Sequence, residues 1–358
     1  MTTTPEDKGR KPLANAQILI KNSHGIAAAL LLGLAGPCHA EPVPYGERAV
    51  VHFRTLPYVA DPHPLDPYVH YVGGYEMTAS GTSLFVGLSD IQVFAKGEGL
   101  HAEAISDSGA AAVFDLVPDG KGGFKDSPLD MDVLHDAAGK SFYGKFTGDS
   151  EDIAYNPATM ERYVSFEGNQ RILKYPAGDA LKGDIWRGRG EQLPITGLPR
   201  FLGNFGMEGL TYIRDPAGDS LLIGVEAGGF WDCDLKDYAC IRVEGPPVPG
   251  FMYMMTSLAV LDYTRPETDH EILALYRYYD PIRGPRNVLS LLRLEGDRAH
   301  GLRLVKIGNL LRVAPPLPYD NYEGVSAVPI PGGYRLYLIC DVLHEADIPK
   351  ILVYDWKR

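Results

Sequence analysis

A repeated pattern of two short apolar segments between acidic residues constrains the fold of this chain most strongly. Each copy runs from a glutamate through an apolar segment, a turn and a second apolar segment to another acidic residue. Short apolar segments bounded by Gly, Pro, Asn or Asp are typical of β-strands in hairpins. The four copies, with intervals of 14, 16, 18 and 18 residues, begin and end at Glu76 and Asp90, Glu151 and Glu167, Glu208 and Glu226, and Glu323 and Asp341.

A hairpin returns the chain to the end from which it started, so the two acidic residues of each copy should lie close together. Hairpins arranged around an axis, as in a β-propeller, would bring these carboxylates to one mouth of a central channel. The pattern therefore predicts an all-β fold with a single propeller. At roughly 45–50 residues a blade, residues 41–358 predict about six blades. The alternative is that acidic residues merely mark strand ends, as they often do.

A fifth copy of the pattern lacks the opening glutamate. It comprises apolar segments at residues 257–261, 271–277 and 288–294, and Arg277 stands where the other copies have an acidic residue. A guanidinium at this position could bind a phosphate oxygen with two hydrogen bonds. It could equally form an ion pair with one of the predicted acidic neighbours, and both interpretations stay open.

The first 40 residues have the features of a secretory signal. Basic residues precede the apolar run at residues 26–34, and the small residues Cys38 and Ala40 suit a cleavage site before Glu41. The run is too short to anchor the mature protein in a bilayer. We therefore expect a signal peptide at residues 1–40 and one domain at residues 41–358, exported as a periplasmic or secreted monomer. An uncleaved amphipathic leader is the alternative.

Export would place the remaining cysteines in an oxidising compartment. Cys233 and Cys240 flank a turn-like segment of six residues, so we expect a disulfide between them. Cys340 lies in an apolar run and is expected to be a buried free thiol. Three cysteines without a Cys-x-x-Cys pair do not indicate a zinc site.

Both ends of the expected domain have strand-like sequences, at residues 45–54 and 350–356. Propellers often complete a blade with a strand from the other terminus, which removes open sheet edges. The pairing of N- and C-terminal strands is therefore expected to close the propeller. Residues 49–54 should lie in or beside the blade that contains residues 323–356.

Charge excludes some partners. The chain has 34 basic and 46 acidic residues and a net charge of −12. A protein this acidic, without a basic stripe, is expected to bind neither nucleic acid nor anionic lipid. The sequence contains no Gly-x-Ser-x-Gly segment, so it does not indicate a hydrolase with a serine nucleophile. Its histidines lack the spacing that is typical of metal ligands.

These repeated segments also resemble a known family. Asp320–Ser326 together with Tyr334–Asp341 is similar to the C-terminal signature of the phytase-like family, also called "esterase-like activity of phytase". Segments 204–210, 148–153 and 71–76, each with the acidic residue that follows, resemble its other signatures in the same order. The resemblance spans residues 48–358 and implies a hydrolase of phosphate esters. The chain departs from the family pattern at Cys340 and at the Glu76–Met77 pair.

Gathered carboxylates repel one another and must take up protons or bind cations. Calcium is abundant outside the cell and takes six to eight oxygen ligands. We therefore predict Ca²⁺ as the cofactor. The resemblance implies an anionic phosphate ester as the substrate, and we predict Glu208, Glu323 and Arg277 as catalytic residues. The alternative is a non-catalytic propeller that uses calcium as a structural pin and binds an envelope ligand or protein. The predicted metal ligands are Asp90, Glu151, Glu167, Glu208, Glu226, Glu323 and Asp341.

Overall fold

The computed structural model describes residues 49–61, 64–177, 184–201, 205–226, 228–265, 270–280, 282, 284–342 and 348–358. The expected signal peptide lies outside the described residues and stays a prediction. Strands dominate the described part of the chain, which confirms the predicted all-β class. The helical elements described are α1 (Lys145–Gly148) and the short 3-10 helix η2 (Asp184–Arg187).

The described strands form five antiparallel groups of four, which we call blades 1 to 5. Blade 1 contains β3 (Leu88–Lys96), β4 (Gly99–Ser106), β5 (Ala110–Leu116) and β6 (Ser127–Val133). Blade 2 contains β7 (Ser150–Tyr155), β8 (Arg162–Phe166), β9 (Arg171–Tyr175) and β10 (Glu191–Gln192). Blade 3 contains β11 (Met207–Ile213), β12 (Ser220–Val225), β13 (Phe230–Asp234) and β14 (Cys240–Val243).

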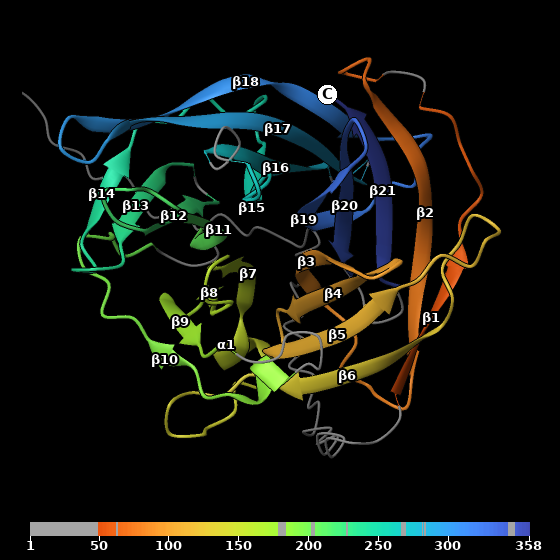
Figure 1. Cartoon of the computed structure of the whole chain (residues 1–358), viewed down its shortest axis with the longest axis horizontal. Coiled ribbons are helices and arrows are strands. Elements are labelled where there is room, and N and C mark those ends of the chain that lie inside the picture. Colours follow the sequence, from red (N-terminus) through yellow and green to blue (C-terminus); the bar gives the residue numbers. More distant parts are fainter. Residues whose placement is uncertain are drawn as a thin grey trace, which may run out of the picture. The chain divides into compact units, whose positions relative to one another are not determined.

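Blade 4 contains β15 (Met254–Val260), β16 (Glu271–Asp280), β17 (Gly284–Asp297) and β18 (Gly301–Val313). Blade 5 combines β19 (Asn321–Ile330), β20 (Gly333–Asp341) and β21 (Lys350–Lys357) with β2 (Val69–Ser80) from the beginning of the described chain. Figure 1 shows the first strand of each blade innermost. These five strands contact one another in chain order, and β19 returns to contact β3.

This ring makes the fold propeller-like, but the described residues hold five blades where the sequence predicts about six. The estimate is too high because the blades use more residues than the assumed 45–50. Strands β17 and β18 have 14 and 13 residues, and long connections such as residues 134–149 add to the chain used per blade.

The two ends of the described chain meet in one sheet. Strand β21 pairs with β2, which aligns Ile351 with Tyr75. Strand β1 (Ala49–Thr55) lies on the other side of β2 and also pairs with β6 of blade 1. The C-terminal strand therefore pairs directly with β2, and residues 49–54 lie beside blade 5 and link it to blade 1.

Each innermost strand has an irregular register near its first residues. The pairing of β11 with β12 skips Glu208, and the pairing of β19 with β20 skips Glu323. The corresponding skipped residues are Ser89 in β3, Glu151 with Asp152 in β7, and Thr256 in β15. Such β-bulges bend a strand and re-aim the side chain of the extra residue. They explain why the acidic residues can leave the sheet surface and point toward the central axis.

Glycine follows the skipped glutamate in blades 3 and 5 because the innermost strands approach closely there. A Cβ atom on Gly324 would lie 2.6 Å from Cα of Asp90, and one on Gly209 would lie 2.7 Å from Cγ of Leu258. No side chain fits at these distances without a shift of its neighbour. The Glu-Gly pairs of the sequence thus combine a glutamate at the axis with close packing between blades.

Apolar side chains pack between adjacent blades. One cluster joins blade 3 to blade 4 and includes Leu210, Ile223, Leu258 and Ile272, all fully buried. Burial of such side chains stabilises neighbouring blades together and so fixes the axis around which the inner strands stand.

The cysteines lie as the sequence predicts. A disulfide joins Cys233 and Cys240, which are directly opposite each other on β13 and β14. Cys340 is a buried free thiol on β20. Among the described residues, no helix has both the length and the hydrophobicity needed to cross a membrane.

Candidate metal centre

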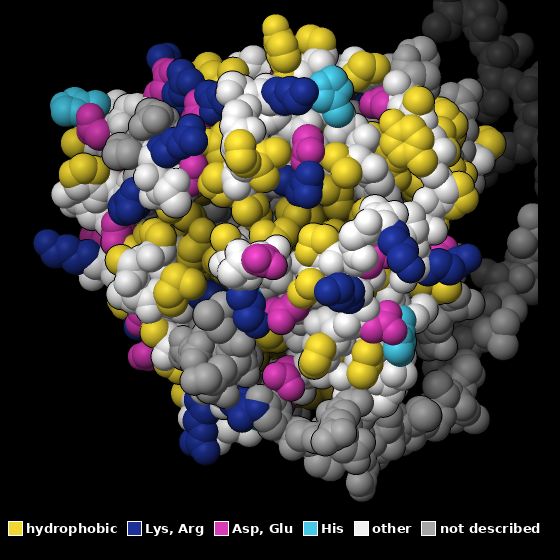
Figure 2. Space-filling view, turned by 45° about the vertical axis from the view of Figure 1, so that its right-hand side comes forward, with side chains coloured by type: hydrophobic (Ala, Val, Ile, Leu, Met, Phe, Trp, Pro, Cys, Tyr) yellow, Lys and Arg dark blue, Asp and Glu magenta, His cyan; other side chains and the backbone are white. Residues whose placement is uncertain are grey.

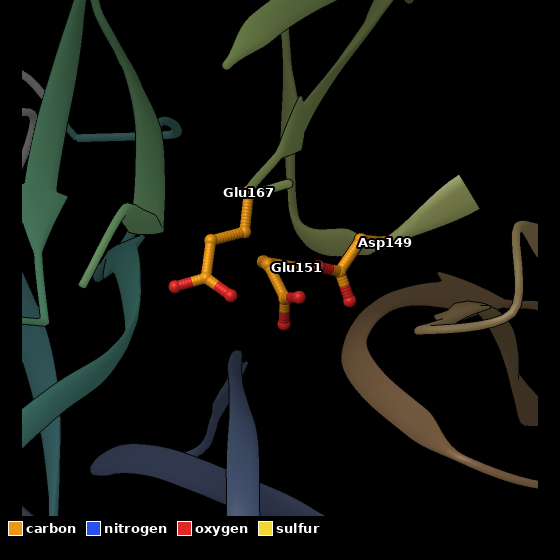
Figure 3. A group of neighbouring side chains, drawn as sticks. All are labelled: Asp149, Glu151 and Glu167. Atoms are coloured by element: carbon orange, nitrogen blue, oxygen red, sulfur yellow. The ribbon is translucent and has the colours of Figure 1, made fainter. Parts of the chain in front are cut away.

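Carboxylates gather at the end of the axis where the innermost strands begin. Oxygens of Asp149, Glu151 and Glu167 all lie within 4.8 Å of one another, and so do those of Glu167, Glu208 and Glu226. Figure 3 shows the first three carboxylates pointing into one shared space. With Glu323 and Asp341, these residues form what we call the acidic mouth.

Two structural positions supply most of the acidic mouth. The β-bulges present Glu151, Glu208 and Glu323 from the first strands. The second strands of the same blades end beside them, at Glu167, Glu226 and Asp341. The hairpin geometry inferred from the sequence therefore brings these six residues together. Their roles as ligands or catalytic groups stay predictions.

Burial raises the pKa values of the carboxyls of the acidic mouth, and repulsion between neighbouring carboxylates contributes to several of these increases. Burial raises the pKa of Glu151 and Glu208 well above the ordinary glutamate value, and repulsion between neighbouring carboxylates adds to the increase. Burial, opposed in part by a hydrogen bond from the backbone N–H of Gly206, raises the pKa of Glu167 to about 7. The pKa of Asp341 is raised to about 8, chiefly by burial and then by Glu323.

Two basic side chains reach the acidic mouth. Arg277, in the second half of the second strand of blade 4, donates hydrogen bonds to Glu323, to Glu226 at 3.0 Å and to Asn321 at 2.8 Å. The structure therefore shows the ion-pair interpretation of Arg277. Lys145 of α1 is more exposed, and its Nζ lies 3.1 Å from Asp107 and 3.5 Å from Asp149.

Two predicted members of the acidic cluster lie elsewhere. Glu76 is on β2, an outer strand, and forms an ion pair with Arg54, so it does not reach the axis. Asp90 is fully buried on β3, one residue beyond the skipped Ser89, and accepts a hydrogen bond from the backbone N–H of Ile153 at 3.1 Å. The sequence pattern treated β2 and β3 as one hairpin, but β2 belongs to blade 5 and β3 pairs with β4 in blade 1.

Asp90 belongs to a separate pair of buried carboxyls with Asp152, which is also fully buried. Asp152 accepts hydrogen bonds from the backbone N–H groups of Leu210 at 2.8 Å and Leu258 at 2.9 Å. The pair therefore connects the first strands of blades 1 to 4. This arrangement is a correction to the prediction that Asp90 is a ligand in the same cluster as the glutamates.

Sequence reasoning missed three charged residues at the acidic mouth. Asp149 precedes Glu151 in the same short segment, and its position two residues before a skipped glutamate was a usable signal. Asp107 follows the second strand of blade 1, where blades 2, 3 and 5 place Glu167, Glu226 and Asp341. Lys145 lies in a connection between blades and had no repeated pattern to mark it.

The residues of the acidic mouth fit a hard divalent cation. Every candidate ligand is a carboxylate oxygen, the ligand type that calcium and magnesium prefer. Buried oxygens of Asp149 and Asp341 accept no hydrogen bond from the described residues. A cation bound here would satisfy these oxygens and offset the repulsion among the carboxylates.

An open groove adjoins the acidic mouth. It has a volume of about 1080 Å³ and shares Asp149 and Glu167 with the candidate metal centre. Lys145 lies at the junction of the groove and the mouth, and Phe142 and Phe146 line its wall. A molecule of moderate size could therefore occupy the groove and place one end against the carboxylates.

We expect the cation-free protein to lose thermal stability as pH rises from 5 to 8. Glu167 and Asp341 have folded-state pKa values of about 7 and about 8, above the ordinary values of 4.5 and 3.8. Groups with raised folded-state pKa values stabilise the native state fully below their unfolded pKa values. This contribution is lost as pH rises through the folded-state values. Melting temperatures of chelator-treated protein across this range test the prediction.

Excess Ca²⁺ should reverse this loss, because calcium competes with protons for the same oxygens. At one hundred times its dissociation constant, the ion should raise the melting temperature at pH 8 by roughly 5 °C or more. The increase should be smaller at pH 5. An equal increase at both pH values would contradict cation binding by the acidic mouth.

The fold and the site together define a propeller-like protein with a carboxylate cluster at one end of its axis. The family model "Phytase-like: Esterase-like activity of phytase" matches residues 83–341, well over half of the chain. The chain therefore belongs to the phytase-like family. No curated protein sequence compared with it matches significantly.

Solved structures give weaker similarities. The Malassezia sympodialis allergen Mala s 1 is 13% identical, with 84% of this chain and 92% of that chain covered and a TM-score of 0.39. The catalytic domain of the Coprinopsis cinerea GH62 α-L-arabinofuranosidase is 12% identical, with 77% and 93% covered and a TM-score of 0.44. Similarities at this level carry no inference about fold or activity.

Proposed function

We propose that this protein is an exported hydrolase of phosphate esters that binds Ca²⁺ at its acidic mouth. The observation that carries the proposal is the convergence of buried carboxylates from blades 2, 3 and 5 beside an open groove. Membership of the phytase-like family supports the reaction class. Export rests on the signal-like sequence of residues 1–40.

The carboxylates of the acidic mouth differ in position, and we assign them different roles accordingly. The carboxylates of Glu167, Glu208 and Glu226, whose oxygens lie within 4.8 Å of one another, would hold the cation, which supplies a Lewis acid for phosphoryl oxygens when bound. Asp149 faces both the cluster and the groove. Its oxygens are therefore placed to accept a proton from a water molecule that attacks a substrate lying in the groove.

The basic side chains have different tasks. The guanidinium of Arg277 is held by Glu226, Glu323 and Asn321, so it orients two carboxylates of the cluster. Lys145 has an exposed side chain at the junction with the groove, where its ammonium could bind a phosphate oxygen. We therefore assign the contact with substrate to Lys145 and a positioning role to Arg277.

The charge of the protein favours a small molecule as the substrate. The chain has a net charge of −12, and the face drawn in Figure 2 mixes acidic and basic side chains over its described part. Nucleic acid would find no continuous basic surface on that face. A small phosphate ester needs only the local charges at the acidic mouth. We propose a monomer, since the groove and the acidic mouth belong to one chain.

Phosphate release from a panel of monoesters tests the proposal directly. We expect turnover with Ca²⁺, its loss after treatment with a chelator and its recovery when Ca²⁺ is added back. Full turnover by thoroughly chelated protein would overturn the role of the cation. If Ca²⁺ raises the melting temperature but no ester is hydrolysed, the protein is not a hydrolase of phosphate esters. That result would support the alternative of a non-catalytic binding protein that calcium stabilises.

A further inference from the structure

We infer that the groove beside the acidic mouth binds the organic part of a phosphate monoester with an apolar, preferably aromatic, body. The inference rests on the proposed function and specifies its substrate class. The groove is continuous with the candidate metal centre because Asp149 and Glu167 line both. A substrate whose phosphate lies against the carboxylates would therefore extend its remaining atoms into this groove.

Three aromatic side chains line part of the groove. Phe142 is buried, Phe201 is half-buried, and Phe146 is 95% exposed although it is a large apolar residue. Exposed apolar surface of this kind is favourable to cover with an apolar ligand. Aromatic rings also pack well against one another in offset or edge-to-face arrangements. The wall therefore suits an aromatic or similarly apolar group.

The buried guanidinium of Arg171 adds a positive charge to the same wall. Arg171 is only 8% exposed, and its guanidinium lies over the rings of Phe142 and Phe166, 4.6 Å and 4.0 Å from their centroids. It donates hydrogen bonds to the backbone carbonyls of Thr147 and Asn169. These contacts fix the aromatic wall in place and leave positive charge close to the groove.

The charges in the groove do not suit a ligand with many phosphates. The basic residues Lys140, Lys145 and Arg171 line it, and so do Asp136, Asp149 and Glu167. With acidic side chains among the basic ones, the groove presents no continuous positive charge to a polyanion. One phosphate at the acidic mouth, followed by an apolar body, matches this distribution. An inositol ring that carries several phosphates does not.

Steady-state kinetics with two monoesters test the inference. We expect kcat/KM for 1-naphthylmethyl phosphate to exceed that for glycerol 2-phosphate by about tenfold or more. Both are alkyl monoesters with similar leaving groups, and only the naphthyl group can cover the aromatic wall. Inositol hexakisphosphate should be the poorest of the three substrates. Equal values for the two monoesters, or a preference for inositol hexakisphosphate, would overturn the inference while leaving phosphate ester hydrolysis intact.

Phe146→Ala provides the residue-level test. We expect it to raise KM for 1-naphthylmethyl phosphate about tenfold with little change in kcat, and to leave glycerol 2-phosphate unaffected. Phe251→Ala is the matched control, because Phe251 is 91% exposed and does not line the groove. Equal effects of the two substitutions would contradict a specific contact at Phe146.

Binding separates the substrate class from the reaction. We expect 1-naphthylmethylphosphonate, which cannot be hydrolysed, to bind in the presence of Ca²⁺ when measured by calorimetry. Its affinity should fall about tenfold in Phe146→Ala and stay unchanged in Phe251→Ala. If the phosphonate binds in this way but no ester is hydrolysed, the result would support binding of an apolar body in the groove and overturn the proposed hydrolase. If the protein hydrolyses glycerol 2-phosphate but does not bind the phosphonate, the groove does not bind an apolar body, and the proposed hydrolase is unaffected.

Discussion

Replacing Glu208 with Gln is expected to lower kcat/KM for a phosphate monoester by at least about 100-fold. Groups that merely support metal ligands contribute 10–100-fold, so a ligand itself should contribute at least as much. Glu208 is buried at the centre of the cluster, where an oxygen lies within 4.8 Å of ligand oxygens from Glu167 and Glu226. Gln keeps the size of the side chain but removes the negative charge that a cation requires. Kinetics and calcium titration of the variant measure both effects.

Glu76→Gln is the matched control. Glu76 opens the first copy of the sequence pattern but lies on outer strand β2 beside Arg54, so its replacement should leave turnover unchanged. Glu208→Gln should also leave the cation-free protein at least as stable as the wild type, because it removes repulsion from a crowded cluster. Full activity and unchanged calcium affinity in Glu208→Gln would refute its assignment as a ligand.

Replacing Glu103 with Ala is expected to destabilise the fold by about 3–5 kcal/mol. Glu103 on β4 and Arg162 on β8 are fully buried and joined by two hydrogen bonds of 2.9 Å and 2.8 Å. The pair connects blade 1 to blade 2, and Arg162 also lies over the ring of Phe94. Loss of the carboxylate would leave a buried guanidinium without its negative partner. Urea unfolding of the variant measures the loss.

Two further variants test the physical reason. Replacing both partners with Met should restore most of the stability, because neither charge then remains buried. Glu295→Ala removes an exposed ion pair with Arg303 and should cost less than about 1 kcal/mol. If Glu103→Ala were as mild as Glu295→Ala, the buried pair would not be a main link between the blades.

The sequence pattern predicted the acidic mouth better than it predicted the blades. Spacing alone placed Glu151, Glu208 and Glu323 beside the acidic residues that end their hairpins, because two strands and a turn must return to one end. It placed residues 49–54 in or beside the last blade, but it could not show that β2 is the strand that completes this blade, since pairing between distant segments depends on tertiary contacts. Glu76 and Asp90 were therefore assigned to a hairpin that does not exist.

The role of Arg277 illustrates the same limit. Its place in the repeat was visible in the sequence, but its partners depend on how blades 3, 4 and 5 meet at the axis. The structure directs its guanidinium to Glu226 and Glu323, one on each side. Lys145 reaches the same place from the connection between blades 1 and 2, and such connections follow no periodic pattern from which a position could be inferred.

The sequence by itself determined the all-β class and the carboxylates of the repeated hairpins, which follow from local periodicity and spacing over a few residues. Its short motifs also carried the resemblance to the family, and the turn-like segment between Cys233 and Cys240 led to the expected disulfide. Only the tertiary structure decided the number of blades, the depth of Asp90, the pairing of Arg277 and the groove beside Glu167. These depend on contacts between residues far apart in the chain, where bulges and close strand packing set the direction of each side chain.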